Sequence, residues 1–313
     1  MNVTALDVGY GWTKAKHGDL IFKQPSVLGD KRPLHEENKK QGYLICDDYF
    51  VGELAVRHSD IKYHSMKESK ASTWTTEVLI KTALTYLRSN GFYTVSGLPV
   101  DFYFNQKDEF ENMLLKLKHQ HSKLEVIGEG ILHEIFEFKH IKIVPQPLGA
   151  AMNYLLNDSC ELVNKDEARG RILIIDWGRY TLDLLILDGM EIHKASCSPP
   201  NLGIESAYKL LRRYIREKLD KTPENHEMDR IVLSGEYEGY DVSPLIDLAF
   251  DAVAQQILLE VEGMNMNFKL HLIVGGQAER LSRNLPLANK IVGDQLSNLN
   301  GYEKIGKRAW GGI

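Results

Sequence analysis

The sequence predicts an α/β protein made of two similar lobes, and three observations support this fold class. The chain has 313 residues, whereas one compact core rarely grows beyond about 250–300 residues. Segments with the patterns of strands and of helices are mixed along the chain, as in α/β proteins. A pattern of strand, glycine-containing turn, strand, tight turn and strand occurs near the N-terminus and again in the middle of the chain.

The first copy of this pattern starts the chain. Its strands are short and rich in apolar or β-branched residues, and glycine-containing turns separate them. A polar loop follows, then a helix marked by one apolar stripe, then a further strand. The predicted segments are strands over residues 3–8, 13–16 and 20–23, the loop over 29–42, the helix over 75–89 and a strand over 93–98.

The second copy places an aspartate and a glycine at the same positions of the first turn. Asp7 ends the first strand of the first copy with Gly9 two residues later, and Asp176 and Gly178 repeat this spacing. We interpret the repetition as an internal duplication. The predicted segments are strands over residues 171–176, 181–187, 230–233 and 270–274, and helices over 203–219 and 246–262.

The composition excludes several classes of protein. Hydrophobic residues make up 43% and charged residues 26% of the chain, which is ordinary for a globular protein and excludes low-complexity and disordered classes. The 38 Lys and Arg against 43 Asp and Glu leave a net charge of −5. A protein that coats nucleic acid needs a basic face to neutralise phosphates, so no direct binding of nucleic acid is expected.

The cysteines and the apolar segments indicate the compartment. Cys46, Cys160 and Cys197 are far apart in sequence, so inert thiols in a reducing cytoplasm are expected rather than a disulfide framework. The first residues lack the basic start of a secretory signal. Asp176, Arg179 and Asp183 interrupt the most apolar stretch, residues 172–187, so no membrane span is expected.

The turn between Asp7 and Lys14 can bind phosphate. Its glycines allow backbone N–H groups to turn inward and form a concave set of donors. Asp7 could hold Mg²⁺ through water, and Lys14 could reach a phosphate as a point charge. Taken alone, the segment also fits a glycine-rich hairpin with a solvated aspartate.

The turn after Asp176 supplies the same chemical groups a second time. Gly178 and Thr181 offer backbone amides and a hydroxyl next to the strand-end carboxylate. Two such turns that face each other would hold a polyphosphate between them, with Asp7 and Asp176 sharing Mg²⁺.

A third segment leads from an apolar strand into Gly275 and Gly276, with a helix starting at Ala278. Without side chains at the two glycines, a flat base or a sugar could approach the backbone closely. An ordinary turn between a strand and a helix remains the alternative.

The order of these segments resembles the superfamily that contains actin, heat-shock chaperones and sugar kinases. The matching segments are Asp7–Gly11, Pro145–Ala150, Asp176–Asp183 and Val274–Ala278. Within it, four further segments are similar to the plasmid-segregating, actin-like ATPases of the ParM type and their archaeal relatives. These are Val95–Val100, Leu202–Ile204, Leu285–Asn289 and Gly301–Tyr302.

The resemblance implies an actin-like fold, with two duplicated RNase H-like lobes around a nucleotide cleft. Lobe I would comprise residues 1–149 and 295–313, and lobe II residues 150–294. The implied cofactors are Mg²⁺ and ATP, with GTP left open. Asp7 and Asp176 would hold the Mg²⁺ through water, and Gln146 would position the attacking water, because an amide is no strong base.

The resemblance also implies which residues contact the nucleotide. Glu205 and Lys209 could face its base or ribose. Three residues depart from the family pattern, namely Trp12, Arg179 and Gln277, and Arg179 could either add charge to the phosphate site or form a structural salt bridge. The implied contacts are Gly9, Tyr10, Gly11, Trp12, Lys14, Gly178, Arg179, Tyr180, Thr181, Glu205, Lys209, Gly275, Gly276, Gln277 and Ala278.

The resulting functional expectation is a filament-forming ATPase whose partners are copies of itself and a DNA-bound adaptor protein, with no membrane. Head-to-tail contacts that do not close into a ring produce such filaments. Two alternatives stay open. The first is a small-molecule kinase or phosphatase, for which Asp101 is the nearest candidate base. The second is a monomeric scaffold that is gated by nucleotide.

Overall fold

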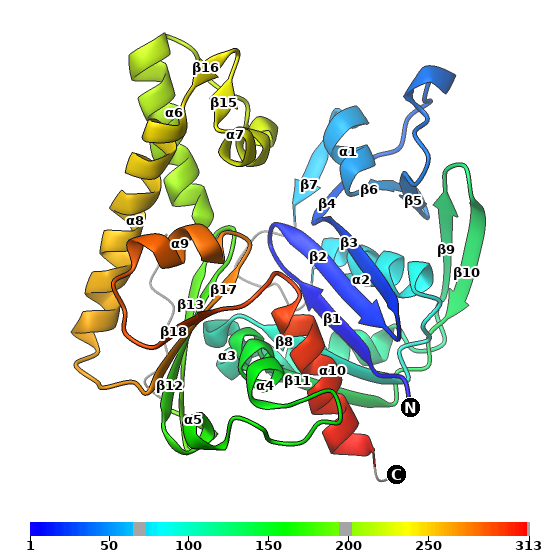
Figure 1. Ribbon diagram of the computed structural model, residues 1–313. Helices are drawn as coiled ribbons and strands as arrows, with labels where there is room; N and C mark the ends of the chain where they lie inside the picture. The colour runs from blue at the N-terminus through cyan, green and yellow to red at the C-terminus, as the bar shows by residue number, and fades with distance from the viewer. Residues whose placement is uncertain (65–72, 194–201, 312–313) are drawn as a thin grey trace. The chain divides into compact units, whose positions relative to one another are not determined.

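The computed structural model describes residues 1–64, 73–193 and 202–311 (Figure 1). The chain forms two compact units. Unit 1 comprises Met1–Lys165 and Leu296–Ile313, and unit 2 comprises Asp166–Gln295. None of the helices within the described ranges is long and apolar enough to cross a bilayer.

Unit 1 is built on a five-stranded sheet with the order β11-β8-β1-β2-β3. β1 lies in the middle, antiparallel to β2 and parallel to β8. All five residues of β1 are buried, as expected for a strand that has helices on both faces. The strands are β1 (Thr4–Val8), β2 (Trp12–His17), β3 (Leu20–Pro25), β8 (Tyr93–Leu98) and β11 (His140–Pro145).

Helices α2 (Trp74–Tyr86) and α3 (Val100–Lys116) pack on one face of this sheet. Helices α4 (Gln146–Leu155) and α10 (Ser297–Trp310) contact its strands β1, β8 and β11. α4 and α10 cross closely, because a Cβ on Gly301 would lie only 1.7 Å from the carbonyl oxygen of Gly149. This crossing keeps α4 in unit 1, so the chain changes unit after residue 165, whereas the sequence prediction placed the change at residue 150.

A second sheet of unit 1 has six strands in the order β10-β9-β5-β6-β4-β7. α1 (Glu53–His58) packs on β4 and β6. The polar run 29–42 contains the end of β4 and the short helix η1 (Glu36–Asn38). The strands are β4 (Val27–Asp30), β5 (Leu44–Cys46), β6 (Tyr49–Val51), β7 (Lys62–His64), β9 (His121–Val126) and β10 (Gly130–Ile135).

Unit 2 repeats the central theme with a five-stranded sheet of order β14-β13-β12-β17-β18. β12 pairs antiparallel with β13 and parallel with β17, just as β1 pairs with β2 and β8. The strands are β12 (Arg171–Trp177), β13 (Leu182–Asp188), β14 (Glu191–Ile192), β17 (Leu270–Gly275) and β18 (Lys290–Val292).

The core of unit 2 lies between this sheet and two long helices. The buried Trp177 packs edge-on against Phe250 and donates its indole N–H to the carbonyl of Leu202 at 2.7 Å. The remaining elements are α5 (Lys165–Arg169), α6 (Ile204–Leu219), η3 (Asn225–Glu227), α7 (Met228–Ser234), β15 (Glu236–Tyr237), β16 (Tyr240–Asp241), α8 (Ser243–Gly263) and α9 (Ala278–Asn284).

One predicted strand is wrong. Residues 230–233 lie in helix α7, not in a strand. Met228, Ile231 and Val232 are buried while Leu233 is 89% exposed, a spacing that fits one face of a helix. A short apolar run does not distinguish a strand from a helix by itself, and here Gly235, with φ of 75°, ends the helix in a left-handed conformation.

Candidate functional site

The hairpin between β1 and β2 is closed by one tight backbone contact. The amide of Gly9 donates to the carbonyl of Trp12 at 3.0 Å, and a Cβ on Gly9 would lie 2.8 Å from that oxygen, so a larger residue does not fit. Ser26 fixes the turn from outside: its hydroxyl donates to the Gly9 carbonyl at 2.6 Å, and its amide donates to the Gly11 carbonyl at 3.0 Å. The turn therefore has a fixed backbone.

Asp7 is the centre of a buried polar cluster at this hairpin. It is 3% exposed and lies opposite Lys14 in the β1–β2 register. The Lys14 ammonium lies 2.6 Å from one carboxylate oxygen of Asp7, and the Gln146 side-chain amide donates to the other oxygen at 2.7 Å. The structure thus brings together three residues that the sequence prediction placed at the site.

The first residue of α4 is Gln146, and its surroundings hold it in place. The hydroxyl of Tyr302 donates to the Gln146 carbonyl at 3.3 Å. Gly97 on β8 leaves the room for this contact, because a Cβ there would lie 1.8 Å from the Tyr302 hydroxyl. Since the amide nitrogen of Gln146 donates to Asp7, its other polar atom, Oε1, is the one that can accept a hydrogen bond from a ligand.

Unit 2 has a hairpin of the same construction between β12 and β13. The amide of Gly178 donates to the Thr181 carbonyl at 3.0 Å, which matches the contact from Gly9 to Trp12. Asp176 lies opposite Asp183 in the register, at the place that Lys14 takes in unit 1. Asp183 is buried and accepts a hydrogen bond from the Thr181 hydroxyl at 3.1 Å. This hairpin therefore carries two neighbouring carboxylates.

Arg179 forms a salt-bridge network at the tip of this hairpin. Its guanidinium contacts Glu205 and Asp229, each at 3.1 Å, and lies over the ring of Tyr208. Burial opposes the charge, but the two carboxylates outweigh it and hold the pKa of Arg179 above its ordinary value. Arg179 therefore takes part in salt bridges within unit 2.

Glu205 and Tyr180, two other residues of the predicted site, belong to the same network. The second oxygen of Glu205 accepts from Arg212 at 2.7 Å, so both oxygens of this carboxylate are paired. Tyr180 is partly buried next to Arg179, and burial raises its pKa. Lys209 lies one turn further along α6 and is exposed.

The Gly275–Gly276 turn borders a cavity within unit 2. Gly275 has φ of 113° and lies against β12, since a Cβ there would be 2.3 Å from the Trp177 carbonyl oxygen. The cavity has a volume of about 450 Å³. It is lined by the predicted residues Gly275, Gly276, Gln277 and Ala278, together with residues 232–233, 279–280, 283 and 293–295. Its size and glycine wall fit a small flat ligand.

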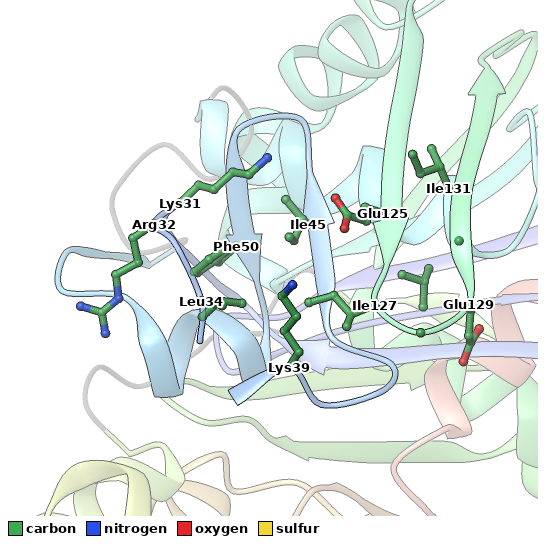
Figure 2. Close-up of a pocket in the computed structure, with 13 residues that line it drawn as sticks. Lys31, Arg32, Leu34, Lys39, Ile45, Phe50, Glu125, Ile127, Glu129 and Ile131 are labelled. Atoms are coloured by element: carbon green, nitrogen blue, oxygen red, sulfur yellow. The ribbon is translucent and has the colours of Figure 1, made fainter. Parts of the chain in front are cut away.

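Unit 1 has a cavity of about 530 Å³ that contains none of the predicted site residues. It lies between the segment of Lys31–Lys39 and the β9–β10 hairpin (Figure 2). Its floor is apolar, and the ammonium of Lys39 and the carboxylate of Glu125 lie at its sides. This cavity is therefore separate from the Asp7 cluster.

Three observations were beyond the sequence prediction. Asp183 lies in the segment Asp176–Asp183 that resembles the superfamily, but the sequence prediction gave it no role. Its place opposite Asp176 could have been deduced from the register of the hairpin. Ser26 and Tyr302 support the site from distant segments, and no local pattern indicates such contacts. Among the described residues, no group of three or more His, Cys, Asp or Glu converges to hold a metal.

Comparison with known proteins identifies the fold. Residues 5–149 match the family model described as the N-terminal domain of actin-like proteins. No curated protein sequence matches the chain. A ParM filament structure from Clostridium botulinum superposes with a TM-score of 0.78 at 22% identity, covering 98% of this chain and 100% of that chain.

An archaeal actin homologue, Ta0583, is similar to the same extent. Its native structure gives a TM-score of 0.77 at 20% identity, and its complex with ADP gives 0.75 at 19% identity. Each comparison covers 98% of this chain and 100% of the other. The chain therefore has the actin-like fold of the ParM proteins and archaeal actin homologues, and the predicted fold class is confirmed.

Proposed function

We propose that this actin-like chain binds Mg-ATP, hydrolyses it and assembles into dynamic filaments, in the role of a plasmid-segregating ParM. The observation that carries the proposal is the pair of matched hairpins, each with an aspartate one residue before the strand end and a tight glycine turn closed by one backbone hydrogen bond. The similarity to a ParM filament subunit and to an actin homologue in complex with ADP supports it.

In this proposal the two hairpins bind the phosphates. The turns Gly9–Trp12 and Gly178–Thr181 supply backbone N–H groups, and Lys14 adds a positive charge. Asp7 and Asp176 would hold Mg²⁺ through water, and Mg²⁺ when bound would neutralise charge on the phosphates. Asp7 already forms an ion pair with Lys14. When a cation and a polyphosphate bind, Asp7 would turn to the cation and Lys14 to the phosphate, so their ion pair would be exchanged for these two contacts.

The adenosine part of the nucleotide would occupy the cavity beside Gly275 and Gly276. The two glycines allow a close approach to the backbone, and the cavity is large enough for a base with its ribose. We assign ATP rather than GTP on the resemblance to ParM, and the comparison of the two nucleotides belongs to the test below.

Hydrolysis would depend on the orientation of Gln146. Asp7 accepts from the amide nitrogen and so leaves the amide oxygen to accept a hydrogen bond from the attacking water. This is a positioning role, and it acts on the transition state more than on binding. The alternative of a small-molecule kinase has less support, because its candidate base Asp101 is exposed at the start of α3.

Light scattering combined with phosphate release tests the proposal. Protein at increasing concentration receives Mg-ATP, Mg-GTP or Mg-ADP, and scattering and free phosphate are followed together. We expect scattering to rise with Mg-ATP above a sharp critical concentration and to decay as phosphate accumulates. Phosphate release without scattering at any concentration would contradict filament formation, and the absence of both would contradict the whole proposal. If scattering rises and decays as expected, a DNA-bound adaptor is sought next by its effect on the rate at which scattering decays.

A further inference from the structure

Two histidines lie side by side on the β9–β10 hairpin of unit 1. The Nδ1 atom of His133 lies 3.2 Å from the Nε2 atom of His121, and the ring centroids are 5.0 Å apart. In the antiparallel register His121 is opposite Ile135, and His133 is opposite Lys123, so the two histidines are diagonal neighbours on the same face of the hairpin. Both are exposed.

The distance between the two ring nitrogens is close to the one that a shared metal ion requires. Imidazole nitrogens bind Zn²⁺ at about 2.0–2.1 Å, and two of them at a tetrahedral angle stand roughly 3.3–3.4 Å apart. The observed 3.2 Å differs from this by only a small movement of exposed rings. We propose that His121 and His133 form a binding site for a divalent first-row transition metal, of which Zn²⁺, Ni²⁺ and Cu²⁺ are the candidates.

The chemistry of the two ligands separates this site from the nucleotide site. Imidazole nitrogen suits Zn²⁺, Ni²⁺ and Cu²⁺, whereas Mg²⁺ takes oxygen ligands. The hydrogen bond between the rings needs one N–H donor and one bare nitrogen. Each ring can present its facing nitrogen as a bare ligand by shifting its proton to the other ring nitrogen, so a metal replaces one hydrogen bond with two coordinate bonds.

The metal would cross-link the two strands of a sheet edge. β10 is the outermost strand of its sheet, and in the described part of the chain no third His, Cys, Asp or Glu joins the pair. In the proposed site the two imidazole nitrogens take two coordination positions of the metal, and water takes the others. By strand alternation, the pair is on the same face of the sheet as Glu125 and Ile131, which line the cavity of Figure 2.

Calorimetric titration of the untagged full chain with ZnCl₂ tests the site. The chain has 11 histidines, so single histidines elsewhere provide weak background binding. Three variants are compared with wild type, namely His121→Ala, His133→Ala and, as the matched control, His226→Ala, which removes an exposed histidine of unit 2. We expect each hairpin variant to bind Zn²⁺ roughly tenfold or more weakly, because one imidazole without its neighbour loses the chelate advantage. His226→Ala should bind as wild type.

A second measurement does not depend on heat of binding. Cu²⁺ added at one equivalent should give an electron paramagnetic resonance spectrum with coupling to two nitrogens in wild type, and to fewer in either hairpin variant. Zinc affinity that is equal in wild type and both hairpin variants would overturn the proposal, as would a loss of affinity that is as large in His226→Ala. Circular dichroism of each variant confirms the fold, and neither measurement requires nucleotide.

Discussion

The β1–β2 and β12–β13 hairpins have the same turn contact but place a different residue opposite the matching aspartate. In each, a glycine amide closes the turn at 3.0 Å, and an aspartate is the last residue but one of the first strand. The residue opposite this aspartate is Lys14 in unit 1 and Asp183 in unit 2. The two hairpins therefore differ at this position: an aspartate faces a lysine in unit 1 and a second aspartate in unit 2.

The difference suggests a division of work under the proposed function. Two neighbouring carboxylates attract a cation, because the repulsion between them is relieved when the cation binds. A carboxylate that is already paired with lysine, and that also accepts from Gln146, is better suited to hold other groups in position. We therefore expect unit 2 to dominate the affinity for Mg-nucleotide and unit 1 to dominate the rate of hydrolysis.

The largest expected effect is that of Asp176→Ala. Removal of this carboxylate should reduce Mg-dependent ATP turnover roughly 100-fold or more, the size typical of removing an electrostatic group from a phosphoryl-transfer site. Phosphate release at several Mg²⁺ concentrations measures it. Asp188→Ala is the matched control, because Asp188 lies at the far end of β13 in a salt bridge with Arg171. Turnover that equals that of the control would contradict the role of Asp176.

Gln146→Ala should separate binding from chemistry. We expect the affinity for ATP to change little and turnover to fall by roughly 100-fold, because positioning of water contributes only in the transition state. Fluorescent-nucleotide titration and phosphate release measure the two quantities on the same sample. If affinity fell and turnover per bound ATP did not, then Gln146 would be a binding residue and the division between the units would be wrong.

The two residues opposite the aspartates should differ in their effect on stability. Lys14→Met leaves Asp7 as a buried carboxylate without its ion-pair partner, and we expect the free energy of unfolding to fall by about 3 kcal/mol at pH 7. Asp183→Asn removes one of two neighbouring carboxylates and keeps an acceptor for the Thr181 hydroxyl, so its effect should stay within about 1 kcal/mol. Urea denaturation of both variants measures the contrast, and equal losses would contradict it.

The sequence allowed the repeated hairpins to be predicted, because strand alternation and the Asp-x-Gly spacing are local patterns. What it did not reveal depends on contacts between distant segments. α4 stays with unit 1 because Gly149 and Gly301 meet, and Arg179 is held by Asp229 from another helix. The prediction of a strand over residues 230–233 was wrong for a different reason. An apolar run this short is compatible with both a strand and a helix, because it is too short to show the period of either.

The smallest expected effect compares one histidine from each unit. Burial lowers the pKa of His17 and of His271, against smaller opposing effects of Glu134 and Glu303 on the first and of the Ala288 carbonyl on the second. Each ring therefore binds fewer protons in the folded state than in the unfolded state just below pH 6.5. The stability that each contributes is present above this pH and is lost as the pH falls through the folded pKa.

The loss should be no more than about 1 kcal/mol for each ring, since both are half-buried and solvent screens the charge. Urea denaturation at pH 7.5 and pH 5.5 measures it, with His17→Gln and His271→Gln compared against the exposed His226→Gln. We expect the pH dependence to become shallower in the first two variants and to stay unchanged in the third. A steeper dependence in His17→Gln would mean that its contact with Thr4, at 2.9 Å, stabilises the charged ring rather than the neutral one.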